Sequence, residues 1–583
     1  MPKTRLMRAL VRITTRRLTL AFTLLSLAAI AFIVTLSSTV PKSPRLVEYE
    51  HQTPTTSELL ARPFSKSPLN PFKKPTKAPP RERNDEHSGS SWWQDGKWLA
   101  VAFSSDLTTD DRVLLPPLKE RPPIYCYRDT SVERPKDEHE AEDELFLTWK
   151  RAWWAHGFRP TVLGATEATI NPAFDEVQRL KLDGVLRADV MRWLAWDTVG
   201  GGLLAENTML PMASNGDPLL AELRRGKYAE LTSWKGLGSG LLAGSGEEVK
   251  SAIRAVLELS EARSVLAALP GDIVKTDATP MSLAYYGPQT IASKYAIIGE
   301  ATRLNRADGL RALNRLINAH LHVVWQNSFS HGIDVLQPYP NHTSKMVSEA
   351  IGLAESLLHC PETPLPASCP PNLPRCAPCT TDMRSTRIAT PSSYHNASKA
   401  FTIGFVPHPW TLTTLNMLKD TFDLNVLRRD SLRDPWLLEV TDRLLDDTHA
   451  VYDELPASGD RRIMRFKEAI ASEEAESRTL FLTAEAPLPS DLDWRFGFSI
   501  PQHAHIPQEQ PPDREDPSED PTLEWILLER AKQVVFETAE TEDTGMRTAL
   551  ETWNMADYEA WKFTRALQAR RVMERSKWAS ESK

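Results

Sequence analysis

Short apolar runs alternate with longer amphipathic segments over residues 113–345. Residues 124–127 form an apolar run between prolines and a polar turn, which predicts a buried strand. Residues 140–156 carry large apolar side chains at helical spacing, with acids early and bases late as the helix dipole favours. After Gly157, residues 161–163 predict a second strand. A strand, a helix and a strand at this spacing indicate a parallel sheet with crossover helices.

The alternation continues along the chain. Residues 185–198 predict a helix, three consecutive glycines end it, and residues 203–205 predict the next strand. A capping box predicts a helix over 247–259. Residues 303–320 predict a further helix and 322–325 a further strand. The pattern therefore predicts one α/β domain.

The amino-terminal segment predicts a membrane anchor. Residues 18–40 carry no charge, and about 20 apolar residues suffice to span a bilayer as a helix. Residues 1–17 carry one lysine and five arginines but no acid, which keeps this tail cytoplasmic by the positive-inside rule. A cleaved signal peptide would have a shorter apolar region, and a mitochondrial presequence would be amphipathic. We therefore expect a single-pass type II membrane protein of the endoplasmic reticulum or Golgi.

The segment after the anchor and two sequons agree with this topology. Residues 41–112 are a polar, proline-rich stem or linker. Asn341 and Asn396 each begin an Asn-x-Ser/Thr sequon. Such sequons are weak signals alone, but they are expected to be glycosylated if this part of the chain is lumenal.

The second half of the chain divides by composition. Residues 346–399 are rich in proline and cysteine, and 400–505 predict an α/β extension with strands at 401–405 and 480–483. An acidic, proline-rich linker covers 506–522, and 523–583 predict a helical carboxyl-terminal tail.

The cysteines of the proline-rich segment leave two alternatives open, a zinc knot or two disulfides. A single C-x-x-C and a lumenal location favour two disulfides, whose pairing the sequence does not define. Cys126 would then be left over and buried. The four cysteines of this segment are Cys360, Cys369, Cys376 and Cys379.

Composition excludes some classes of function. Hydrophobic residues make up 41% of the chain and charged residues 25%, which is ordinary globular usage. Lys+Arg 69 against Asp+Glu 77 gives a net charge of -8, so nucleic-acid binding has no electrostatic support. Five cysteines in this length exclude a small disulfide scaffold.

The most informative run covers residues 186–212. Asp189 and Arg192 lie three residues apart on the predicted helix, and Gly200 and Gly201 follow before the predicted strand. This run resembles the core motif of DXD-type glycosyltransferases, in which Asp-x-x-Arg and Gly-Gly precede a strand that ends in Asp-x-Asp. The wider domain also resembles fungal type II membrane proteins.

The resemblance implies a GT-A-like fold, that of nucleotide-diphospho-sugar transferases, with a mixed sheet and flanking helices. It implies a lumenal enzyme that transfers a sugar from a nucleotide-sugar donor to a glycan or lipid acceptor, with Mn²⁺ or Mg²⁺ neutralising the leaving diphosphate. Asp189 and Glu206 would be catalytic. The implied donor-binding residues are Arg187, Asp189, Arg192, Gly200, Gly201 and Asn207.

The sequence departs from the family at the metal-binding positions. The two aspartates of Asp-x-Asp fall on Ala205 and Asn207, with Glu206 between them; a shift by one puts them on Glu206 and Thr208. Metal-independent catalysis, a weakened metal site and lost activity are therefore all open. An inactive scaffold or binding protein of the secretory pathway is the main alternative, and a hydrolase is a third. Asp189 and Arg192 could also form only a surface ion pair.

Two histidines are weak metal candidates beside Glu206. His320 and His322 alternate in the sequence, so on a strand they would share one face. In the family that the chain resembles, a histidine late in the domain often completes the metal shell. The competing interpretation is that both are buried, hydrogen-bonded histidines.

Overall fold

A computed structural model describes the following residues: 115–116, 118–129, 133–180, 182–257, 264–269, 273–336, 345–379, 388–389, 399–406, 466–467, 470–472, 477–483, 488–501 and 544–581. The predicted anchor 18–40, both sequons and the acidic linker lie outside these residues. Within them, no helix is both long and apolar enough to cross a bilayer.

A six-stranded mixed sheet forms the centre of the amino-terminal half, in the order β2-β1-β3-β6-β5-β7. Strands β1, β2 and β3 are parallel, β6 is antiparallel to β3 and β5, and β5 and β7 are parallel. The predicted α/β class, the mixed sheet and the three parallel strands are confirmed. The strands are β1 (Pro123–Tyr127), β2 (Arg159–Leu163), β3 (Gly201–Ala205), β5 (Thr232–Trp234), β6 (Leu241–Ser245) and β7 (Lys275–Asp277).

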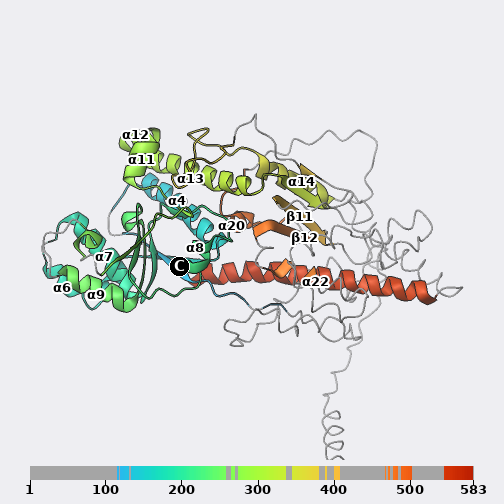
Figure 1. Ribbon diagram of the computed structural model, residues 1–583, viewed down its shortest axis with the longest axis horizontal. Coiled ribbons are helices and arrows are strands. Elements are labelled where there is room, and N and C mark those ends of the chain that lie inside the picture. Colours follow the sequence, from blue (N-terminus) through green and yellow to red (C-terminus); the bar gives the residue numbers. More distant parts are fainter. Residues whose placement is uncertain are drawn as a thin grey trace, which may run out of the picture. The chain divides into compact units, whose positions relative to one another are not determined.

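Helices cover both faces of this sheet (Figure 1). On one face, α4 (Lys136–Ala155) and α13 (Arg306–Ser328) share a core with Ile124 and Leu203. On the other face, α5 (Ala165–Ile170), α7 (Gly184–Thr198) and α9 (Gly246–Leu257) share a second core with Leu204. Successive residues of a strand point to opposite faces, so adjacent Leu203 and Leu204 serve different cores. Four tryptophans of these cores are fully buried: Trp149, Trp153, Trp193 and Trp196.

A second sheet is entirely parallel, in the order β10-β9-β11-β12. The predicted strands at 401–405 and 480–483 correspond to β11 and β12. The hydrophobic core that α4 and α13 share with the six-stranded sheet continues into this second sheet through Ile333, Phe401 and Leu482. The strands are β9 (Gly332–Leu336), β10 (Ile388–Ala389), β11 (Ala400–Val406) and β12 (Thr479–Thr483), and β4 (Met209–Pro211) pairs separately with β8 (Leu283–Tyr285).

The predicted strand at 322–325 is wrong, because these residues lie inside α13. Asn305 caps this helix by accepting hydrogen bonds from the amides of Ala307 and Asp308. Buried positions then recur at helical spacing as far as Gln326. Packing along the whole helix outweighs the strand preference of a short Val-Val-Trp run.

The remaining elements complete the two layers. They are α6 (Phe174–Arg179), α8 (Pro218–Leu223), η2 (Gly238–Gly240), α10 (Val265–Ala268), α11 (Pro288–Lys294), α12 (Ala296–Leu304), α14 (Lys345–Leu358), α20 (Leu492–Phe496) and α22 (Thr544–Glu581). The long helix α22, red in Figure 1, lies within the predicted helical tail 523–583.

The last turns of α22 contact the beginning of the α/β layer. Trp578 donates a hydrogen bond from Nε1 to the Pro160 carbonyl at 3.1 Å, and its ring lies 4.9 Å from that of Trp154. Arg121 forms an ion pair of 2.9 Å with Glu574. These contacts fix the carboxyl-terminal helix to residues beside β1 and β2.

Candidate functional site

A polar network surrounds Glu206 at the carboxyl end of β3. The hydroxyl of Tyr285 donates to Glu206 Oε2 at 2.8 Å, and the hydroxyl of Ser239 donates to Oε1 at 3.1 Å. Arg192 Nη1 lies 3.6 Å from the same Oε1. We call these four residues the Glu206 network.

Local backbone structure brings the four residues together. Glu206 follows directly after β3, and its amide donates to the Gly240 carbonyl at 2.9 Å. This bond fixes the η2 turn, which carries Ser239, beside the end of the strand. A Cβ on Gly240 would lie 3.0 Å from the ring of Tyr285 and 2.8 Å from Met209, so glycine lets the tyrosine approach.

The network combines a buried cation with a partly exposed carboxylate. The Arg192 side chain is 10% exposed and that of Glu206 is 31% exposed. Arg192 Nη2 also donates to the Ser239 carbonyl at 2.8 Å. Burial, and then the negative charge of Glu206, raise the pKa of Tyr285, so this residue remains a hydrogen-bond donor at neutral pH.

Asp189 lies outside the network. Its Oδ2 accepts a hydrogen bond from the Val265 amide at 2.8 Å, at the start of α10. No ion pair between Asp189 and Arg192 occurs in the described part of the chain. Arg187 lies on the same helix, five residues before Arg192, and its side chain is exposed. The structure therefore brings Arg192 to Glu206 but places Asp189 between two helices.

The two glycines and Asn207 lie at opposite ends of β3. Gly200 precedes the strand and Gly201 begins it, and the 5 residues of β3 span roughly 16 Å at the usual rise. Asn207 follows Glu206 at the carboxyl end and is partly buried. The glycines therefore cannot contact the same small group as Glu206. They have φ angles of 84° and 83°, which favour glycine and turn the chain from α7 into β3.

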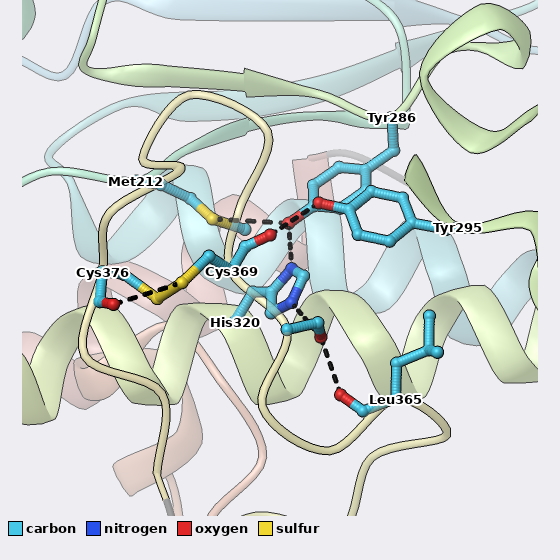
Figure 2. Close-up of a disulfide and its surroundings, with 8 residues drawn as sticks. Met212, Tyr286, Tyr295, His320, Leu365, Cys369 and Cys376 are labelled. Carbon is cyan, nitrogen blue, oxygen red and sulfur yellow. Dashed lines mark hydrogen bonds between the residues drawn. A yellow bond between two sulfur atoms is a disulfide. The ribbon is translucent and has the colours of Figure 1, made fainter. Parts of the chain in front are cut away.

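His320 belongs to a buried network around a disulfide, not to the Glu206 network (Figure 2). Its Nδ1 lies 2.7 Å from the Tyr286 hydroxyl and its Nε2 lies 2.9 Å from Ser368 Oγ. Burial lowers the pKa of His320 to about 4. A neutral imidazole thus joins α13 to the proline- and cysteine-rich segment.

His322 has a separate environment. Its Nε2 lies 2.7 Å from the Leu357 carbonyl, and its ring stacks on Phe498 at 4.5 Å between centroids. Burial lowers its pKa to about 4. The prediction that His320 and His322 share one strand face is wrong, because both lie in α13. Side chains two residues apart on a helix point about 200° apart around its axis.

The four cysteines of the proline-rich segment form two nested disulfides, Cys360–Cys379 outside and Cys369–Cys376 inside. The hydroxyl of Tyr295 donates to the Cys369 carbonyl at 2.7 Å, which fixes the inner loop to α11 and α12. Cys126 is free and buried, and burial raises the pKa of its thiol to about 12. Such a thiol is a packing group rather than a nucleophile.

The residues around Glu206 do not fit a divalent cation held by two carboxylates. Glu206 is the single carboxylate of the network, and both of its oxygens already accept hydrogen bonds. The described residues contain no group of three or more His, Cys, Asp or Glu side chains placed to hold a metal ion. Among the described residues, the positive charge within 4 Å of Glu206 is the guanidinium of Arg192.

Sequence reasoning missed Ser239 and Tyr285. Each is far from Glu206 in sequence, and each reaches it through a strand pairing or a tight turn that local patterns do not specify. The glycine-rich run 236–240 was the one available signal, since such a run permits close approach of another segment.

The fold and this network define a mixed α/β protein with a charged site at the carboxyl edge of its sheet. Residues 86–583 match a family described as a domain of unknown function (DUF8765), and the chain belongs to that family. No curated protein and no solved structure matches the chain significantly.

Proposed function

We propose that the protein is a lumenal glycosyltransferase with a GT-A-like domain, held in the endoplasmic reticulum or Golgi by its predicted anchor. It would transfer a sugar from a nucleotide-sugar to a glycan or lipid acceptor. The observation that carries the proposal is the buried Arg192 beside Glu206 at the carboxyl end of β3. Open α/β sheets bind their ligands at this edge.

The chemistry of the donor fits a site built around Arg192. A nucleotide-sugar loses a nucleoside diphosphate, and a guanidinium can bind two phosphate oxygens at once. Glu206 would accept hydrogen bonds from sugar hydroxyls through the part of its carboxylate that faces solvent. Asp189 is then a positioning residue, because it fixes α7 against α10 and so holds Arg192 in place.

One observation favours a second candidate, a catalytically inactive scaffold or binding protein of the secretory pathway. Both oxygens of Glu206 are engaged, and the flanking positions carry Ala205 and Asn207 in place of acids. A site that has lost its chemistry could keep such a closed network for stability alone.

Thermal unfolding of the full-length chain in detergent tests donor binding, with a panel of nucleotide-sugars in Mn²⁺ and again in chelator. We expect one nucleotide class to raise the Tm in both conditions, because a ligand at 100 times its Kd stabilises the folded state by about 2.7 kcal/mol. Arg192→Gln should abolish the shift. Arg254→Gln removes the same charge from an exposed position of α9 and should keep it.

A transfer assay then separates the two candidates. Transfer of labelled sugar to a glycan or lipid acceptor would support the enzyme, and binding without transfer would support the scaffold. A flat Tm response to every donor, with and without metal, would contradict the proposed donor site.

Asp189→Ala should behave differently from Arg192→Gln. We expect it to lower the free energy of unfolding by about 1 kcal/mol, because the Val265 amide loses its acceptor. The donor-induced Tm shift should persist. Loss of that shift in a variant that remains folded would instead make Asp189 a donor ligand, as the sequence predicts.

A further inference from the structure

A cavity of about 320 Å³ opens at the carboxyl ends of β1 and β2, on the face of the sheet that α4 covers. We call it the α4 pocket. It shares no residue with the Glu206 network. Its lining residues are Arg128, Asp143, Phe146, Leu147, Lys150 and Val162.

The charges around the α4 pocket leave one cation without a counterion. Arg128 pairs with Glu142 at 3.0 Å and with Asp143 at 2.5 Å. Arg134 shares Glu142, with its Nη1 at 2.6 Å from Oε1. Two carboxylates therefore serve two guanidinium groups. Among the described residues, no carboxylate lies within 4 Å of the Lys150 ammonium.

Lys150 stands in partly desolvated surroundings. It is partly buried on α4, and burial lowers the pKa of its amine, an effect that the charge of Asp143 opposes. A partly buried ammonium without a direct partner costs free energy. An anion that enters the pocket would supply the missing charge.

The rest of the lining is apolar. The Cζ atom of Arg128 lies 5.2 Å from the centroid of the Phe146 ring, a cation–π contact between two residues that line the pocket. Leu147 is 38% exposed, although it is a large apolar residue. With Val162 they form a wall that suits an apolar or planar group, and the volume lies in the range of small-molecule sites.

We propose that the α4 pocket binds a phosphate group carried on an apolar or planar body, with Lys150 Nζ as the anion's partner, while Arg128 keeps its ion pairs with Glu142 and Asp143. A nucleotide and an amphipathic lipid phosphate share this chemistry. The inference does not depend on the proposed glycosyltransferase activity, because it uses none of the residues of the Glu206 network.

Calorimetric titration of the full-length chain tests the proposal. The probes are phenyl phosphate, octyl phosphate, inorganic phosphate and benzyl alcohol. We expect one of the two organic phosphates to bind at least about tenfold more tightly than either inorganic phosphate or benzyl alcohol. Only a molecule with both a phosphate and an apolar body can contact the Lys150 ammonium and the apolar wall at the same time. Preference for phenyl phosphate would indicate a nucleotide-like ligand, and preference for octyl phosphate a lipid-like one.

Three variants assign the site. Lys150→Gln should weaken binding by at least about tenfold, and Lys150→Arg should retain most of it. Lys136→Gln removes the same charge from the first turn of α4, where the side chain is 92% exposed, and should have no effect. Equal binding by Lys150→Gln and the wild type would overturn the proposal, as would failure of both organic phosphates to bind the wild type.

A measurement on the wild-type chain avoids dependence on the folding of a variant. Lysine acetylation is followed by mass spectrometry with and without the preferred organic phosphate. We expect the ligand to slow acetylation of Lys150 and to leave that of Lys136 unchanged. Unchanged acetylation of Lys150 at a saturating concentration of ligand would also overturn the proposal.

Discussion

Gly201→Ala is expected to lower the free energy of unfolding by more than about 3 kcal/mol. Its φ of 83° is strained for any residue with a side chain, and an added Cβ would lie 2.6 Å from the Gly244 carbonyl oxygen and 2.7 Å from the Gly246 amide. These neighbours are backbone atoms of β6 and α9 and cannot move aside without breaking the β3–β6 pairing. Urea unfolding of the full-length chain in detergent measures the loss.

Gly200→Ala is the matched control for this substitution. Gly200 has nearly the same φ, 84°, but an added Cβ would meet no atom within 4 Å. Only the conformational cost applies, about 1 kcal/mol. Equal losses for the two variants would show that the steric contact with β6 and α9 has no energetic weight.

The second large effect is a loss of stability in acid. Burial lowers the pKa values of His320 and His322 to about 4, below the usual value of 6.5 in an unfolded chain. The unfolded state therefore binds protons first as the pH falls. The stabilisation is complete above pH 6.5, is lost progressively between pH 6.5 and 4, and amounts to about 2 kcal/mol per histidine at pH 5.

Urea unfolding at pH 7.5 and at pH 5 checks this expectation. His320→Asn and His322→Gln should each reduce the difference between the two pH values by about 2 kcal/mol. His331→Gln replaces an exposed histidine just beyond α13 and should leave the difference unchanged. The same pH difference in all three variants and the wild type would mean that other groups cause the acid sensitivity.

Much of the first α/β layer could be predicted, because local signals bound its elements. Prolines precede β1, Gly157 follows α4, and three consecutive glycines mark the passage from α7 into β3. Strands of three residues, such as β5, β7 and β8, are too short to show the alternation of hydrophobic and polar residues that predicts a strand. The strand predicted at 322–325 is wrong for a different reason. These residues have a strand preference, but they lie inside the long, buried helix α13.

The candidate site was only partly predictable. The motif identified Arg192 and Glu206, since it fixes one position on a helix and one at the end of the following strand. It also grouped them with Gly200 and Gly201, although the length of β3 separates these glycines from Glu206. Tyr285 comes from β8 and Ser239 from η2, so only the three-dimensional pairing of distant segments reveals their contacts.

The docking of α22 has a consequence for the order in which the protein can fold during synthesis. Its contacts link residues 453 positions apart, Arg121 and Glu574, and 418 positions apart, Trp578 and Pro160. Trp154 and the edge strand β2 therefore leave the ribosome long before their covering helix exists. Until then this apolar surface lacks its cover, and folding is completed only after the helix has been synthesised.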